Sequence, residues 1–175
     1  MHITVLNGSP RPAGNTEIMA DAFIKGASEK GHTVVKINLA GKKISGCLGC
    51  QKCFTAEGVC VQKDDMAQIL DVLDQTDMVV FASPVYWFDI TAQLKCVIDR
   101  MYARAVKGFH FNKVALLLDS CSEGVYDAAI TQYKAMNAYL RWEDQGIITI
   151  AGMEAKGDMK DAPKLASVCE LGRSL

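Results

Sequence analysis

The sequence has 175 residues, half of them hydrophobic, and a formal net charge of −1 at pH 7. This length can bury one core, so we expect a single domain over residues 1–175. The near-neutral charge argues against a nucleic-acid partner, and no apolar run approaches the ~20 residues that span a bilayer. Because His2 leads directly into the first predicted strand, there is no room for a signal peptide. We therefore expect a cytoplasmic protein without a membrane partner.

The first predicted strand leads into a loop that is rich in proline, glycine and hydroxyl groups. Residues 8–14 contain two prolines and two glycines, and Asn15 and Thr16 then begin a predicted helix. Free N–H groups in the first turn of a helix attract anions, as does the helix dipole. The side chains of Ser9, Arg11 and Thr16 can also donate hydrogen bonds to phosphate oxygens. The sequence therefore predicts an anion site here.

The same loop lacks the signatures of two larger phosphate ligands. Gly14 is followed by Asn15 and Thr16, so the lysine with which a P-loop neutralises a triphosphate is missing. The glycines at positions 8 and 14 also do not match the G-x-G-x-x-G fingerprint for dinucleotides. A site for one terminal monophosphate remains, although an ordinary strand-to-helix turn would have similar residues.

Beyond this loop the chain alternates helices and strands. A stretch over about residues 40–65 is too long for a simple connection, and loops of such length are usually functional. We expect a continuous apolar strand over residues 78–82, typical of the centre of a parallel sheet. The other expected strands are the first one, around residues 3–6, and those at 32–39, 114–118 and 146–151. The expected helices cover 15–30, the segment after Asp64 or Asp65, the segment from Ile90 to Met101, one ending at Leu140, and 162–171, which Gly172 would end.

This alternation predicts a three-layer α/β fold, with a five-stranded parallel sheet in the flavodoxin-like order 2-1-3-4-5 and helices on both faces. Ligands bind such sheets beyond the carboxyl ends of the strands, where the strand order reverses. That position lies between the first and third strands. The loops that follow these strands, residues 8–16 and 83–89, are the two with unusual residues, so we expect both to border one crevice.

The second of these loops carries three consecutive aromatic residues. Tyr86, Trp87 and Phe88 follow Pro84 and Val85 at a strand end, where a loop is normally polar. Aromatic rings and nearby backbone amides suit a flat heteroaromatic ring. Together with a monophosphate site one strand away, this loop predicts FMN. The alternative is that the three aromatic rings pack against a core edge or a dimer interface.

Three motifs in this order resemble the flavodoxin-like NAD(P)H-dependent FMN reductase family, including its iron-sulfur flavoprotein branch. They are Gly8-Ser9-Pro10-Arg11-x-x-Gly14-Asn15-Thr16, Ser83-Pro84-Val85-Tyr86-Trp87, and Ala92-Gln93-Leu94-Lys95 with Ile98-Asp99-Arg100. The resemblance implies that the FMN phosphate is bound by Ser9, Arg11, Asn15 and Thr16. It implies that the flavin ring and ribityl chain are held by Pro84, Val85, Tyr86, Trp87 and Phe88, with Ser120 approaching from a third loop. It also implies a homodimer or homotetramer.

Four of the seven cysteines lie in the long loop, as Cys47, Cys50, Cys53 and Cys60. Their spacing, C-x2-C-x2-C-x6-C, is typical of a chain that wraps a 4Fe-4S cluster, and it resembles the spacing in iron-sulfur flavoproteins. Four thiolates can equally hold zinc in a closed site. Free thiols with a structural or redox role are the third interpretation.

The sequence predicts no catalytic side chain, because no histidine lies at the carboxyl end of a strand and hydride transfer to FMN needs no protein base. We expect an FMN-binding oxidoreductase that uses NAD(P)H to reduce flavin or a small electron acceptor. One alternative is an iron-sulfur flavoprotein, which by resemblance exchanges electrons with ferredoxin-type carriers. Another is a non-enzymatic FMN-binding module that senses redox state. Asp99 and Arg100 are expected to form a structural ion pair or an interface contact.

Overall fold

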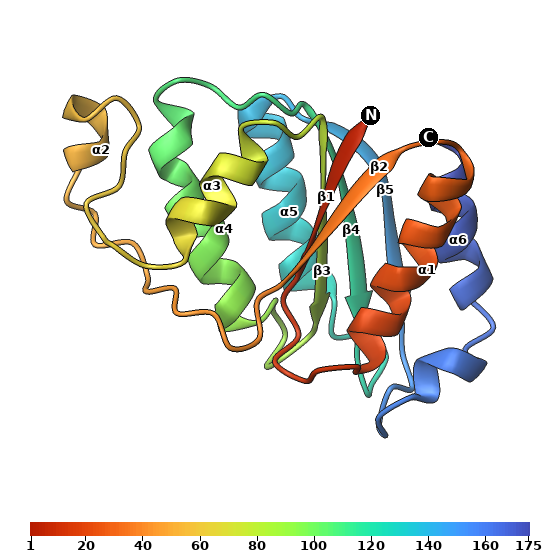
Figure 1. Cartoon of the computed structure of the whole chain (residues 1–175). Helices are drawn as coiled ribbons and strands as arrows, with labels where there is room; N and C mark the ends of the chain where they lie inside the picture. Colours follow the sequence, from red (N-terminus) through yellow and green to blue (C-terminus); the bar gives the residue numbers. More distant parts are fainter.

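The computed structural model describes residues 1–175 and contains one sheet of five parallel strands in the order β2-β1-β3-β4-β5. This confirms the predicted strand order. All strands point toward the same edge of the sheet, where the loops after β1, β3 and β4 meet (Figure 1). The strands are β1 (His2–Asn7), β2 (Thr33–Asn38), β3 (Met78–Pro84), β4 (Lys113–Asp119) and β5 (Glu143–Ile150).

Helices cover both faces of the sheet and complete the predicted three layers (Figure 1). One face carries α1 (Asn15–Glu29) and α6 (Leu165–Arg173). The other carries α3 (Met66–Leu73), α4 (Ala92–Ala105) and α5 (Asp127–Leu140). Two short elements were not predicted from the sequence: α2 (Lys52–Thr55) inside the long loop, and the 3-10 helix η1 (Asp158–Asp161) after β5. No helix is long and apolar enough to cross a membrane.

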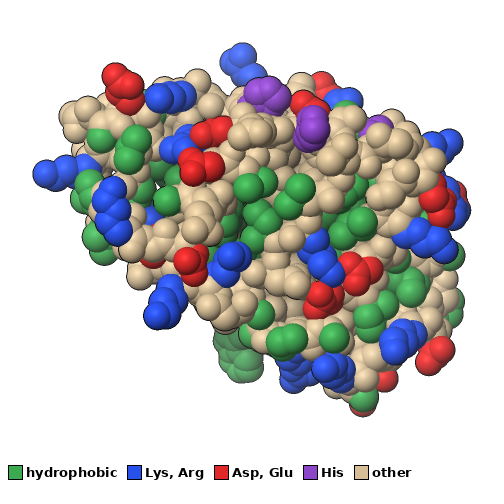
Figure 2. Space-filling model, viewed as in Figure 1, with side chains coloured by type: hydrophobic (Ala, Val, Ile, Leu, Met, Phe, Trp, Pro, Cys, Tyr) green, Lys and Arg blue, Asp and Glu red, His purple; other side chains and the backbone are tan.

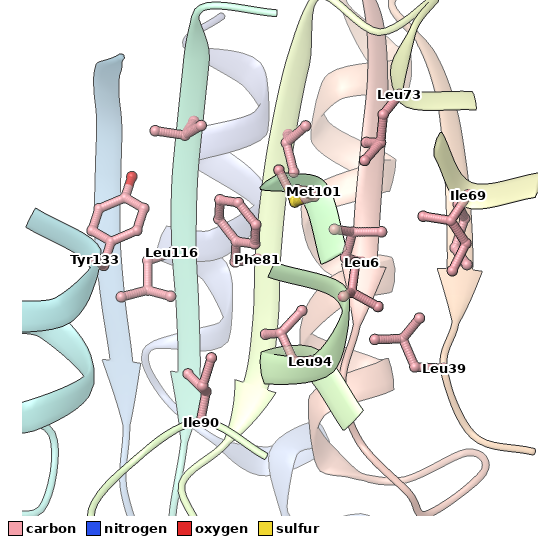
Figure 3. Packing of buried hydrophobic residues seen from close by; sticks show 14 of the residues in the cluster. Leu6, Leu39, Ile69, Leu73, Phe81, Ile90, Leu94, Met101, Leu116 and Tyr133 are labelled. Atoms are coloured by element: carbon pink, nitrogen blue, oxygen red, sulfur yellow. The ribbon is translucent and has the colours of Figure 1, made fainter. Parts of the chain in front are cut away.

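Alternation along the strands divides the core into two clusters. In β3, Val79 and Phe81 pack toward α3, α4 and α5, while Met78 and Val80 pack toward α1 and α6. Figure 3 shows the first cluster, in which Phe81 lies between side chains of the neighbouring strands and faces the helices. Because β3 is buried along its whole length, its sequence is continuously apolar from Met78 to Ala82 rather than alternating.

The structure corrects the predicted role of Gly172. This glycine lies inside α6 instead of ending it, and α6 continues to Arg173. A Cβ atom at Gly172 would lie 2.3 Å from the carbonyl oxygen of Phe23, and one at Gly26 would lie 1.9 Å from that of Cys169. Two glycines therefore allow the backbones of α1 and α6 to approach closely. Gly31, by contrast, follows α1 with a φ of +80°, as expected for a residue that ends a helix.

The long loop between β2 and α3 extends away from the sheet, beyond α3 and α4 (Figure 1). It carries hydrophobic side chains on its surface, visible on the lobe at the upper left of Figure 2. Leu48, Phe54, Val59 and Val61 are all exposed. We call residues 40–65 the cysteine loop.

Candidate functional site

Three loops are hydrogen-bonded to one another at the carboxyl edge of the sheet. The Thr91 hydroxyl, at the start of α4, donates to the carbonyl of Gly8 over 2.7 Å. The backbone N–H of Val85 donates to the carbonyl of Asp119 over 2.8 Å. A Cβ atom at position 8 would lie 2.8 Å from both Leu94 Cβ and Thr91 Oγ1, so this close approach requires glycine. These contacts hold together the loops that border the predicted crevice.

The start of α1 offers unpaired backbone donors to this crevice. Gly14 is the N-cap residue and has no side chain that could cap the helix. The backbone N–H groups of Asn15, Thr16 and Glu17 have no acceptor within the protein. Ser9 and Arg11 line the same pocket. Free N–H groups at the N-terminus of a 15-residue helix are the arrangement that binds phosphate groups.

Two side chains predicted to contact phosphate are engaged elsewhere in the structure. The amide of Asn15 donates to Ala155 O (2.8 Å) and accepts from Gly157 N (2.8 Å) and Met159 N (3.3 Å). The Thr16 hydroxyl donates to Asp119 Oδ1 over 2.5 Å. The prediction that these two residues bind phosphate therefore depends mainly on their backbone N–H groups.

Asp119 brings a buried carboxyl group to the pocket. It ends β4, is 4% exposed, and lines the pocket with Ser9, Arg11 and Thr16. Burial raises the pKa of Asp119 to about 6, although the hydrogen bond from Thr16 and the charge of Arg11 act in the opposite direction. The sequence places Asp119 at a strand end, but it does not indicate the hydrogen bond between Asp119 and Thr16, which lie 103 residues apart.

The aromatic loop is divided between the wall of the pocket and its exposed tip. Pro84, Val85 and Tyr86 line the pocket, whereas Trp87 and Phe88 do not. Trp87 is 93% exposed and forms an edge-to-face pair with Phe88. Both residues have positive φ angles, +51° and +70°, in a two-residue turn closed by hydrogen bonds between Tyr86 and Asp89. Strained non-glycine residues of this kind cluster at ligand sites.

The third loop and the segment after β5 complete the pocket. Ser120 lines it, and its hydroxyl is hydrogen-bonded to Tyr126. Cys121 of the same third loop lines the pocket as well, and sequence reasoning missed Met153 and Lys156, which also line it. Lys156 lies between Ala155 and Gly157, the two residues that the Asn15 side chain holds. No local motif marks this lysine, because its position depends on a contact with α1.

The three histidines lie at the opposite edge of the sheet. His2 begins β1, His32 Nδ1 accepts a hydrogen bond from the N-terminal amine, and His110 Nδ1 lies 2.9 Å from the carbonyl of Thr76. They do not line the pocket.

The cysteine loop forms a second candidate site. Its four cysteines, all free thiols, line one cavity together with Arg100 and Tyr102 of α4. The backbone N–H of Gly49 donates to Cys47 Sγ over 3.5 Å. No three of the Cys, His, Asp or Glu side chains of the chain are grouped closely enough to hold a metal ion in this conformation. The loop thus brings its cysteines to one cavity without closing them around a single ion.

Comparisons with known proteins agree with this geometry. An iron-sulfur flavoprotein of Archaeoglobus fulgidus is 46% identical over 94 residues, which are 54% of this chain and 42% of that protein. An iron-sulfur flavoprotein of Methanocaldococcus jannaschii is 34% identical over 135 residues, which are 75% of this chain and 69% of that protein. The matched segments thus cover about two fifths and two thirds of these relatives.

Solved structures show the same fold at low sequence identity. An azoreductase from Bacillus anthracis has a TM-score of 0.75 at 17% identity and covers all of both chains. An NAD(P)H:quinone oxidoreductase from Methanothermobacter marburgensis has a TM-score of 0.69 at 17% identity, over 99% of this chain and 95% of that one. These likenesses confirm the flavodoxin-like fold.

A family model described as NADPH-dependent FMN reductase matches residues 1–155. This range includes β1 to β5, the three loops of the pocket and the cysteine loop. The chain therefore belongs to the NADPH-dependent FMN reductase family.

Proposed function

We propose that this chain is an FMN-dependent oxidoreductase whose cofactor is held by the loops after β1, β3 and β4. The observation that carries the proposal is the convergence of unpaired helix N–H groups and an aromatic loop on one pocket. When bound, FMN supplies hydride acceptance and one-electron release, and the protein supplies binding and orientation. Electrons leave for a small-molecule acceptor or a carrier protein.

The pocket has donors for the phosphate end of FMN. Its volume of about 70 Å³ is far below the ~300–1,000 Å³ of a site that encloses a whole drug-sized ligand. The enclosed part therefore suits the phosphate and ribityl end. The flavin ring would lie against the loop tips, where Tyr86, Trp87 and Phe88 are exposed. The exposed rings also support the prediction of a homodimer or homotetramer, in which a second copy covers this edge.

We propose Lys156 as a further phosphate-binding residue. The Asn15 side chain bonds to both of its neighbours, and the Ala155 N–H donates to Asp158 Oδ2 over 2.7 Å. This fixed turn holds the lysine at the pocket that Arg11 also lines. Two cations from separate loops would oppose the charge of Asp119 and complement a phosphate dianion.

A second candidate function is supported by the cavity of four cysteines. The donor set, four thiols lining one cavity, is chemically suited to an iron-sulfur centre or to zinc. A 4Fe-4S cluster sits between its thiolates and needs them farther apart than a single zinc ion does. The spacing C-x2-C-x2-C-x6-C and the likeness to proteins named iron-sulfur flavoproteins support the cluster over zinc. The chain would then exchange electrons with a ferredoxin-type carrier.

Anaerobic rapid mixing tests the electron route. FMN-loaded protein would be mixed with NADPH, with NADH and with a reduced ferredoxin, while flavin absorbance is followed. The matched control is the Cys47→Ser/Cys50→Ser variant, which leaves the FMN loops intact. Reduction by ferredoxin in the wild type but not in the control supports the cluster route. Equal reduction of both proteins by a nicotinamide cofactor alone supports the simple reductase, and no reduction by any donor contradicts the proposed function.

A further inference from the structure

Two arginines of α4, four residues apart, are hydrogen-bonded to the cysteine loop. Arg100 Nη1 donates to Ser45 O (2.9 Å) and to Asp64 Oδ2 (2.8 Å), and Nη2 donates to Asp64 Oδ1 (3.0 Å). Arg104 Nη1 donates to Gly58 O over 2.7 Å. Asp99 and Arg100 do not pair with each other: Asp99 pairs with Lys95, and Arg100 pairs with Asp64. Both arginines thus have an evident structural role.

Only Arg100 reaches the cavity of the four cysteines. It is 2% exposed and lines that cavity, whereas Arg104 does not. The Nε atom of Arg100 is buried and has no hydrogen-bond acceptor, while the Nε atom of Arg104 donates to Asp74 over 2.8 Å. A buried donor on a charged group is costly when it is left unpaired. The hydrogen bonds that Arg100 makes to the loop therefore leave its Nε–H without an acceptor.

The charge near Arg100 is only partly balanced by Asp64. Burial acts to lower the pKa of Arg100, but the hydrogen bonds to Asp64 act to raise it, and the pKa is raised overall. Asp64 occupies Nη1 and Nη2 in a bidentate pair. The Nε–H of Arg100 is therefore the part of the guanidinium that Asp64 leaves free beside the cysteines.

We propose that Arg100 is a positioning residue that sets the reduction potential of an iron-sulfur centre in the cysteine loop, its Nε–H donating to a cysteine sulfur of the same cavity. The inference rests on the proposed cluster. Adding an electron makes such a centre more negative, so a fixed positive charge and an N–H donor at a ligand sulfur favour the reduced state. Arginine stays charged at all relevant pH values, so this effect does not depend on titration.

The test is a redox titration of the iron-loaded protein under anaerobic conditions, followed by EPR. The Arg100→Gln variant should lower the equilibrium constant for one-electron reduction at least tenfold, which is 59 mV. Arg100→Lys keeps the charge without the Nε donor, so its potential should lie between those of the wild type and Arg100→Gln. Arg104→Gln is the matched control, because it loosens the loop from the same helix without touching the cavity, and it should leave the potential unchanged.

Iron analysis distinguishes a failure of the Arg100 inference from a failure of the proposed cluster. Wild-type protein that takes up no iron overturns the cluster and this inference together. Iron-loaded wild type with the same potential as both Arg100 variants overturns the role of Arg100 alone, as does an equal shift in Arg104→Gln. If Arg100→Gln fails to assemble, the Asp64→Asn/Arg100→Gln variant removes both charges of the pair. Its potential should still fall below the wild-type value, and an unchanged potential would overturn the inference.

Discussion

The hydroxyl of Thr16 donates to the carboxylate of Asp119 over 2.5 Å, joining the first turn of α1 to the end of β4. This bond lies inside the proposed phosphate pocket, where a negative charge opposes the ligand. Asp119 is buried there at the end of β4, which lies between β3 and β5 inside the sheet. Ionisation of Asp119 should therefore weaken the binding of an anion in this pocket.

Asp119 should make the unliganded protein less stable as the pH rises. Its pKa is about 6 in the folded protein and ordinarily 3.8, so the folded state holds this proton more tightly. The protonated Asp119 carboxyl therefore contributes its full stabilisation of the folded state below pH 3.8, and this contribution is lost as the pH rises through 6. It amounts to about 3 kcal/mol. Urea unfolding from pH 4 to 7 should show Asp119→Asn gaining stability relative to the wild type as the pH increases. A difference that is constant with pH would contradict the assignment.

Lys156→Gln should weaken FMN binding about tenfold, because it removes one of the two cations at the phosphate pocket. Riboflavin, which lacks the phosphate, should bind the variant and the wild type equally. Flavin fluorescence titrations measure both affinities. Lys160→Gln is the control, since Lys160 lies in η1 outside the pocket. Equal losses for FMN and riboflavin would show that the lysine acts on the fold rather than on the phosphate.

Trp87→Gly should separate stability from cofactor binding. The φ of +51° is strained for tryptophan and free of strain for glycine, and the exposed ring contributes little packing. We expect the free energy of unfolding to rise by up to about 1 kcal/mol, while FMN binds more weakly because a ring contact is lost. Calorimetry and FMN titration on the same sample check both effects. A variant that is less stable yet binds FMN normally would show that the turn serves the fold alone.

Gly26→Ala should be strongly destabilising. The new Cβ would lie 1.9 Å from the carbonyl oxygen of Cys169, a backbone atom that cannot move without separating α1 from α6. Overpacking of this kind typically costs about 1–3 kcal/mol or more. Thermal unfolding should show a clear fall in Tm, whereas the exposed control Ser28→Ala on the same helix should unfold near the wild-type temperature. An unchanged Tm for Gly26→Ala would mean that the two helices pack less closely.

The sheet and its order were predictable because apolar strands, helix periodicity and turn residues repeat in a regular βα pattern. The same reasoning predicted the two unusual loops and the pattern of four cysteines. It misplaced Gly172, because a glycine near a helix end reads as a terminator unless the neighbouring helix is known. Asp119, Lys156 and the unpaired donor of Arg100 depend on contacts between residues far apart in the chain, which no local pattern reveals.

The most direct test is a flavin and metal analysis of the protein purified under anaerobic conditions and then supplied with FMN. We expect one FMN per chain and about four irons, matching the four cysteines of the loop. FMN without metal would retain the proposed oxidoreductase and remove the cluster from it. Protein that binds no FMN, even with the cofactor in excess, would contradict the central claim.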